Sequence, residues 1–96
     1  MKILVDIDGT ICESAERKYD KASPLPDNIE KINKLYEEGN TIIYYTARGR
    51  SSGIDYTELT VEQLNDWGCK YHGVIMNHKL AYDLLICDKT KRIEEL

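Results

Sequence analysis

Five polar residues stand at or near the ends of short apolar runs, and their types suit metal-assisted phosphate chemistry. Asp6 and Asp8 close the first run, Thr46 follows the second, and Asp88 follows the last, with Lys79 in the segment before it. The carboxyl ends of parallel strands meet at one edge of a sheet, where such sheets bind their ligands. If these runs are parallel strands, the five side chains converge on one site.

The carboxylates of this set predict a magnesium site. Asp6 and Asp8 are two positions apart, so an extended strand would point both toward the same face. Close carboxylates repel one another, and Mg²⁺ relieves that repulsion by taking oxygen ligands. Asp88, on a neighbouring strand, would complete the coordination. Because Mg²⁺ favours a substrate phosphate among its ligands, the acids also predict a phosphorylated substrate.

The remaining polar groups would hold the phosphate. The Thr46 hydroxyl, the Lys79 ammonium and the main-chain amides of Asp8 and Gly9 are the expected ligands of its oxygens. Arg48 and Arg50, close to the threonine in sequence, could bind a second anionic group of the substrate. The alternative for both arginines is an ordinary solvated charge on a loop.

Composition predicts one small acidic domain over residues 1–96. The chain is 42% apolar, which suffices for a packed interior, and its net charge of −4 argues against a duplex nucleic-acid partner. No apolar run approaches the roughly 20 residues of a membrane helix. Asp6 and Asp8 interrupt the apolar core that a signal peptide needs. Three cysteines without C-x-x-C spacing favour a reducing, cytoplasmic setting over a disulfide or zinc scaffold.

The hydrophobic pattern predicts an α/β fold: a Rossmann-like parallel sheet of about four strands, with helices flanking it in three layers. Strands are expected at 2–7, 41–45, 73–76 and 84–87, and helices at about 24–39, 57–68 and 90–96. The first strand lacks alternation, which is typical of a strand covered on both faces. Residues 11–23 and 47–55 are expected to be loops, and 77–83 is too short for a crossover helix.

Two helices show apolar faces at helical spacing. The inward face of the first is expected to be Ile29, Ile32, Leu35 and Tyr36. That of the second is expected to be Val61, Leu64 and Trp67, with Thr57 as the residue that caps its start.

The motifs Asp6-Ile7-Asp8-Gly9-Thr10, Thr46, Lys79 and Asp88 resemble, in order, the four motifs of the haloacid-dehalogenase (HAD) superfamily, most of whose members are phosphatases. The segments T-A-R-G, G-I-D-Y-T-E-L-T and Y-D-L-L-I-x-D-K further resemble a small capless group linked to polysaccharide biosynthesis.

This resemblance implies a magnesium-dependent phosphomonoesterase that acts on a small phosphorylated metabolite such as a sugar phosphate. Asp6 would be the nucleophile that forms an aspartyl-phosphate, and Asp8 the acid and base. Thr46 and Lys79 would bind the transferring phosphoryl group. The Asp6 carboxylate, the Asp8 main-chain carbonyl and Asp88 would hold Mg²⁺.

Three features bear on that implication. Cys87 stands where the family often has the first acid of a pair, which predicts weaker metal binding. Leu80 follows Lys79 where many relatives have proline, so the chain departs from the family pattern beside the lysine. The segments 11–45 and 47–78 leave no room for a cap, so the site would be open, serving a large substrate or covered by another subunit of a homo-oligomer.

Two other protein classes stay open at this point. A receiver domain also combines acids, a threonine and a lysine around Mg²⁺, but it lacks a general acid two residues after its phosphorylated aspartate, where this chain has Asp8. A degenerate relative would bind phosphate and metal without turnover, and Cys87 makes that reading worth testing.

Overall fold

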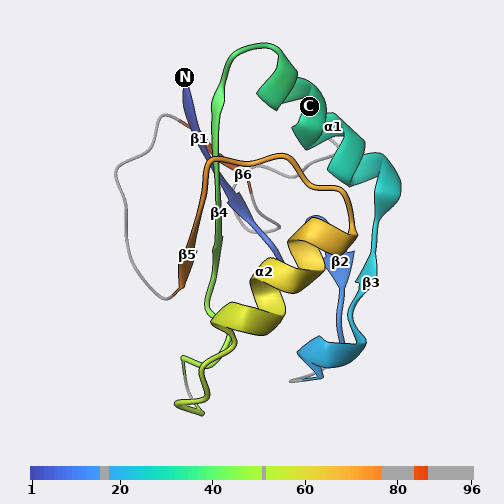
Figure 1. Cartoon of the computed structure of the whole chain (residues 1–96), viewed down its shortest axis with the longest axis vertical. Helices are drawn as coiled ribbons and strands as arrows, with labels where there is room; N and C mark the ends of the chain where they lie inside the picture. The colour runs from blue at the N-terminus through green and yellow to red at the C-terminus, as the bar shows by residue number, and fades with distance from the viewer. Residues whose placement is uncertain (16–17, 51, 77–83, 87–96) are drawn as a thin grey trace.

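A four-stranded parallel sheet forms the centre of the computed structural model, which describes residues 1–15, 18–50, 52–76 and 84–86. The strands are β1 (Lys2–Asp6), β4 (Thr41–Thr46), β5 (Gly73–Met76) and β6 (Leu84–Ile86). They lie in the order β5-β4-β1-β6, and every neighbouring pair is parallel (Figure 1). The predicted parallel α/β architecture is therefore confirmed. The expected connection at 77–83 lies outside the described residues.

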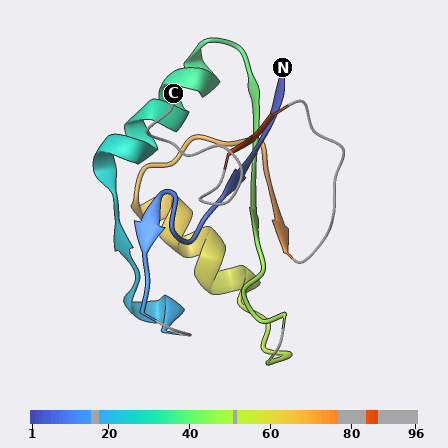
Figure 2. The same cartoon turned by 180° about the vertical axis from the view of Figure 1, so that it is seen from behind.

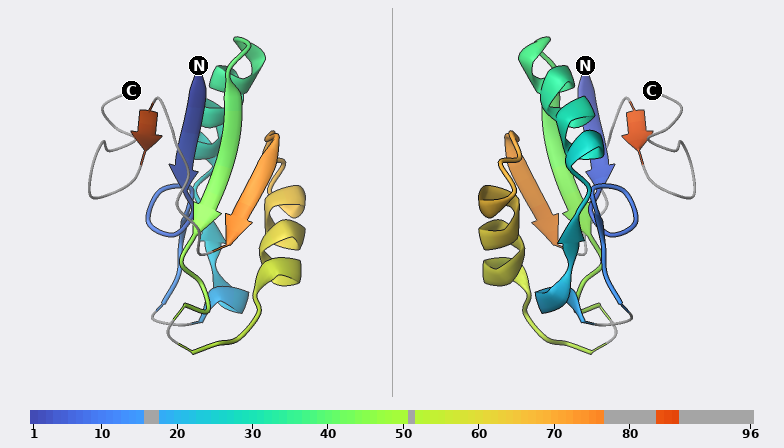
Figure 3. Two further views of the ribbon diagram at one scale, coloured as in Figure 1. Left: turned by 90° about the vertical axis from the view of Figure 1, so that its left-hand side faces the viewer. Right: turned by 90° about the vertical axis from the view of Figure 1, so that its right-hand side faces the viewer.

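Both described helices cover the same face of this sheet. Helix α1 (Pro26–Glu37) connects β1 to β4, and α2 (Thr57–Asp66) connects β4 to β5. The two connections step across the sheet in the same direction, so right-handed crossovers place both helices on one side (Figure 1 and Figure 3). The described residues thus form two layers. The predicted helix at 90–96, which the third layer would require, lies outside them.

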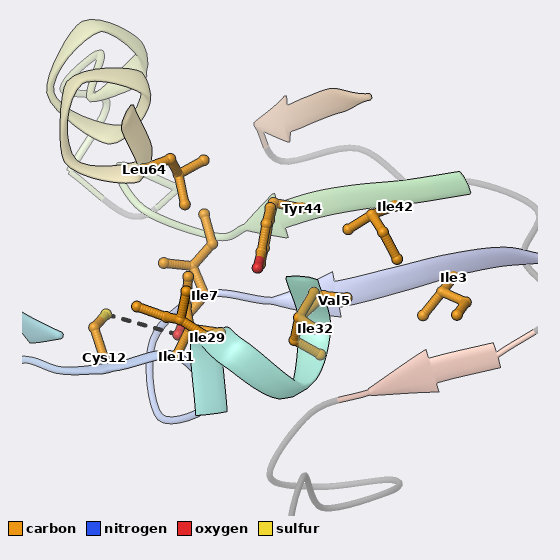
Figure 4. Packing of buried hydrophobic residues seen from close by; sticks show 10 residues of the cluster. All are labelled: Ile3, Val5, Ile7, Ile11, Cys12, Ile29, Ile32, Ile42, Tyr44 and Leu64. Carbon is orange, nitrogen blue, oxygen red and sulfur yellow. Dashed lines mark hydrogen bonds between the residues drawn. The ribbon is translucent and has the colours of Figure 1, made fainter. Parts of the chain in front are cut away.

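The core fills the space between this sheet face and the helices. Its fully buried members come from both central strands, both helices and the turn after β1 (Figure 4); they are Ile3, Val5, Ile7, Ile11, Cys12, Ile29, Ile32, Ile42, Tyr44 and Leu64. In β1 the opposite-facing Leu4 is also buried, as predicted for a strand covered on both faces. In β4 burial alternates instead, and Ile43 and Tyr45 on the other face are half-buried.

The segment after β1 is more ordered than the sequence suggested. Residues expected to form a loop contain β2 (Cys12–Glu13) and β3 (Ser23–Pro24), which pair antiparallel, with a 3₁₀ turn η1 (Tyr19–Lys21) between them (Figure 1 and Figure 2). Ile11 and Cys12 are fully buried, so core packing fixes this hairpin where it leaves the sheet. The hairpin and its 3₁₀ turn are all that the described chain places between β1 and α1.

The helix ends follow local chemistry. Helix α1 starts at a proline, as predicted, and its chain turns away through Gly39 at φ 95°. The predicted cap of α2 was wrong, because Thr57 is already the first helical residue. Its amide donates instead to Asp55 Oδ1 at 2.9 Å, so the aspartate two positions earlier satisfies this helix end. In the described part of the chain no helix has the length and apolar character needed to cross a membrane.

Candidate active site

The carboxyl ends of β1 and β4 bring the first predicted site residues together. The register of this strand pair places Asp6 opposite Tyr45, one residue before Thr46. Asp8 follows just beyond β1, and the buried Thr46 hydroxyl donates to Asp8 Oδ2 at 3.5 Å. The same hydroxyl accepts the Arg48 amide at 3.1 Å. The structure thus joins one predicted acid to the predicted hydroxyl, and that hydroxyl also closes the turn after β4.

The turn after β1 is built by Gly9. Its φ of 86° lies in the region that glycine adopts without strain, and the amides of Thr10 and Ile11 both donate back to the Ile7 carbonyl. The Gly9 amide donates to the Cys12 carbonyl at 2.9 Å. The turn therefore already uses the Gly9 amide, and its predicted binding of a phosphate oxygen stays a prediction. The glycine allows the chain to reverse direction immediately after Asp8, at the end of the sheet.

Arg48 is the main partner of Asp8. Its Nε donates to Oδ2 at 2.9 Å and its Nη2 donates to Oδ1 at 2.8 Å, which makes a two-pronged ion pair. The arginine is 1% exposed. The expectation of a solvated loop charge is thus wrong for Arg48. Arg50, two residues later, is exposed as that expectation required.

Side chains of α2 hold the other end of this guanidinium. Arg48 Nη1 donates to Gln63 Oε1 at 2.6 Å and to Thr60 Oγ1 at 3.3 Å. Gln63 Nε2 in turn donates to the Tyr19 carbonyl at 2.6 Å, and the Tyr19 ring lies 4.9 Å from the guanidinium carbon. Burial by itself lowers the pKa of Arg48, but the hydrogen bonds and charge of Asp8 outweigh that effect and raise it. The arginine is therefore a permanent cation.

Sequence reasoning missed Thr60, Gln63 and Tyr19 as members of this network. A signal was present, because Thr60 and Gln63 share a helix face with Leu64 and Trp67 at spacings of three and four. Two polar side chains on an otherwise inward apolar face require buried partners. Those partners could not be identified before the fold placed the arginine beside them.

Two further groups contact the Asp8 carboxylate. Ser14 Oγ donates to Oδ1 at 3.2 Å, and Cys12 Sγ lies 3.5 Å from the same oxygen. Burial, reinforced by the charge of Asp8, raises the pKa of the Cys12 thiol to about 12. Cys12 is therefore a neutral hydrogen-bond donor at this site and not a thiolate nucleophile.

The donor chemistry of the strand ends suits Mg²⁺. Asp6 is half-buried at the tip of β1, and its Oδ1 accepts the Ile7 amide at 3.0 Å. With the Asp8 main-chain carbonyl it offers hard oxygen ligands of the kind that magnesium takes. Within the described ranges no three acidic, histidine or cysteine side chains gather as a metal cluster. The third predicted ligand, Asp88, lies outside those ranges, as does Lys79.

Strand β6, which precedes Asp88 in the sequence, nevertheless lies where the predicted site requires it, next to β1. It lies beside β1, parallel to it, with Ile86 opposite Val5. The chain therefore leaves β6 at the same edge of the sheet as Asp6, and Asp88 comes two residues later in the sequence. The sequence analysis also expected the strand before Asp88 to lie next to the first strand.

Neither protein-family models nor curated protein sequences match this chain. Solved structures do. A structural-genomics target from Vibrio cholerae superposes with a TM-score of 0.73 at 21% identity, covering 95% of this chain and 76% of its own. The D,D-heptose 1,7-bisphosphate phosphatase from B. bronchiseptica, crystallised with magnesium and phosphate, gives 0.58 at 21% identity over 78% of this chain.

This chain spans about half of that phosphatase, 48% of its length. At such low identity the two superpositions bear on the fold and on nothing finer. They agree with the parallel sheet and its flanking helices. The chain therefore shares the α/β fold of these two structures, without a cap in its described part.

Proposed function

We propose that this protein is a magnesium-dependent phosphomonoesterase that works through an aspartyl-phosphate at Asp6. The proposal rests on one observation: the carboxyl ends of parallel neighbouring strands lie at the same edge of the sheet. β1 lies between β4 and β6, all three run parallel, and Asp6, Asp8 and Thr46 stand where β1 and β4 end. Ligands of open parallel sheets bind at this edge. The site residues carried over from the HAD motifs are proposed on that basis.

In the proposed reaction an Asp6 carboxylate oxygen attacks phosphorus and displaces the substrate oxygen. Asp8 gives the leaving oxygen its proton, then takes a proton from the water that hydrolyses the aspartyl-phosphate. Thr46 and Lys79 are proposed to hold the phosphoryl oxygens. Asp8 lies two residues after Asp6 at the same edge of the sheet, which supports this assignment, because an acid–base group must lie near the reacting atom.

Magnesium is the proposed metal, held by the Asp6 carboxylate, the Asp8 carbonyl and Asp88. When bound, it would offset the repulsion between an anionic nucleophile and an anionic phosphate. The oxygen-only donor set supports this choice. The heptose bisphosphate phosphatase with the same fold was crystallised with magnesium and phosphate, which also supports it.

The proposed substrate is a small phosphorylated metabolite, with sugar phosphates as the first class to test. The matched D,D-heptose 1,7-bisphosphate phosphatase is named for a sugar phosphate substrate, which supports testing sugar phosphates first. The short hairpin between β1 and α1 leaves the sheet edge without a cap in the described chain. We propose that a second subunit of a homo-oligomer covers the open edge.

The test is a turnover screen over phosphorylated metabolites that includes sugar phosphates and aryl phosphates. We expect phosphate release that needs Mg²⁺ and stops on chelation. Asp6→Asn should abolish it, whereas Asp66→Asn, an exposed acid at the end of α2, should leave it unchanged. Full turnover by Asp6→Asn would show the mechanism to be wrong. Tight binding of a metal fluoride without turnover of any ester would identify a degenerate relative instead.

A further inference from the structure

We infer that Arg48 is a positioning residue that fixes the rotation of the Asp8 carboxylate, and that Gln63 of α2 holds Arg48 in place. The inference rests on the proposed function, in which Asp8 transfers the proton. It differs from the sequence-based prediction for Arg48, which was contact with an anionic group of the substrate.

The contact between the two side chains sets an orientation as well as a charge balance. Both oxygens of Asp8 are bound, one by Nε at 2.9 Å and the other by Nη2 at 2.8 Å. A planar guanidinium that binds both oxygens fixes the plane of the carboxylate, whereas a lysine ammonium acts as a point charge and leaves that plane free. Arg48 therefore controls the direction in which the Asp8 lone pairs point.

The surroundings of Arg48 keep it from turning toward a substrate. Its Nη1 donates to Gln63 at 2.6 Å, and Gln63 is held by its second bond to the Tyr19 carbonyl. The Tyr19 ring covers the guanidinium and packs edge-on against Tyr56, with ring centroids 5.0 Å apart. With 1% of the arginine exposed, a substrate anion could reach it only by displacing these partners. The network is built to hold an internal partner.

The consequence for catalysis depends on the leaving group. An alkyl phosphate has a poor leaving oxygen that needs the proton from Asp8, whereas a nitrophenyl phosphate leaves readily without full protonation. General acid catalysis is worth about 10²–10⁴-fold, and a misplacement of about 1 Å can cost about 100-fold. A misoriented Asp8 should therefore slow alkyl esters more than aryl esters.

The experiment compares kcat/KM for one alkyl and one nitrophenyl phosphate, because kcat/KM reports the step that expels the leaving group when that step is irreversible. For Arg48→Lys, which keeps the charge, we expect about tenfold more loss on the alkyl ester than on the aryl ester. Gln63→Leu, of similar volume, should show the same preference at a few-fold level. Lys34→Met, which removes an exposed charge on α1, should change neither value.

Each result has a defined meaning. Equal losses on both esters in Arg48→Lys and Gln63→Leu, expressed as a higher KM with unchanged kcat, would overturn the inference and restore the role of Arg48 as a substrate ligand. Unchanged values in both variants would also overturn it. If Arg48→Lys does not fold in a thermal unfolding scan, Gln63→Leu decides the question. Failure of the wild type on every ester would refute the proposed function itself, which the variants could not do.

Discussion

Helices α1 and α2 cover the same face of the sheet but bury different chemistry. α1 places Ile29 and Ile32 in the core, whereas α2 buries Thr60 and Gln63 beside Leu64. The polar pair of α2 binds Arg48, from the loop that leads into that helix. The difference indicates that α1 contributes mainly to stability and α2 mainly to the geometry of the site. Substitutions on the two sides should therefore have separable effects.

Among the substitutions that separate the two regions, the largest effect is expected from Asp8→Asn, because the Asp8 carboxylate binds Arg48 beside α2. Loss of the acid should lower kcat/KM for an alkyl phosphate by about 10²–10⁴-fold. Because the variant leaves a buried guanidinium without its carboxylate, it should also lower the free energy of unfolding by about 1–3 kcal/mol. Steady-state kinetics and urea unfolding measure the two losses. Wild-type activity in a stable Asp8→Asn protein would show that the side chains held by α2 do not contribute to catalysis.

On the α1 side, Ile32→Ala should lower stability and leave the chemistry intact. Ile32 is fully buried, so its truncation should reduce the free energy of unfolding by about 2–5 kcal/mol. Ile32→Val is the matched control and should cost about 0.5–1.5 kcal/mol. Activity per folded molecule, measured well below the melting temperature, should equal that of the wild type. A drop of activity without a drop of stability would mean that α1 also shapes the site.

Alkaline pH tests Cys12, which packs in the core and also contacts Asp8. The folded pKa of this thiol is about 12, against 9.0 for the free group, because burial disfavours the thiolate. Its contribution to stability is present below pH 9 and is lost as pH rises toward 12, since only the unfolded chain ionises in between. The pKa of Cys69, raised by burial to about 11, acts in the same direction.

For Cys12 the free energy of unfolding should fall by about 1 kcal/mol between pH 9 and pH 10. Urea unfolding at a series of pH values measures this slope. Subtracting the curve of Cys12→Ser, which does not titrate in that range, isolates the contribution of the thiol. Identical slopes in the wild type and Cys12→Ser would show that this thiol is not kept neutral by the fold.

The smallest effect is expected where the two helical regions meet at the surface. Lys70, shortly after α2, forms an ion pair with Glu37 of α1, and their side chains are 51% and 58% exposed. Lys70→Met should cost about 0.2–1 kcal/mol of unfolding free energy, and salt should screen that difference. A larger loss that persisted at high salt would mean that this exposed pair, unlike most, helps to fix the two helices together.

The strand ends could be predicted from the sequence because they depend on local pattern. The apolar runs of β1 and β4 stop at Asp6 and Thr46, and parallel pairing then brings those residues to one edge. The apolar face of α1 follows from spacing in the same way. Gly9, which the sequence offered only as a source of phosphate-binding amides, builds the turn after β1 and bonds its own amide within that turn.

Burial of Arg48 could not be predicted in this way. A charged residue beside glycine in a polar loop looks solvated, and only the folded chain brings Asp8 and Gln63 against it from 40 and 15 positions away. The β2–β3 hairpin was missed for a similar reason, because two-residue strands carry almost no periodic signal. Long-range pairing decided both features.

The central claim is that Asp6 accepts the phosphoryl group. The direct measurement is acid quenching during turnover, followed by borohydride reduction and peptide mass spectrometry, which converts an aspartyl-phosphate to homoserine. An aspartyl-phosphate at Asp6 would give homoserine at position 6, dependent on Mg²⁺ and absent from Asp6→Asn. Homoserine at another aspartate, or rapid phosphate release with no modification at position 6, would contradict it.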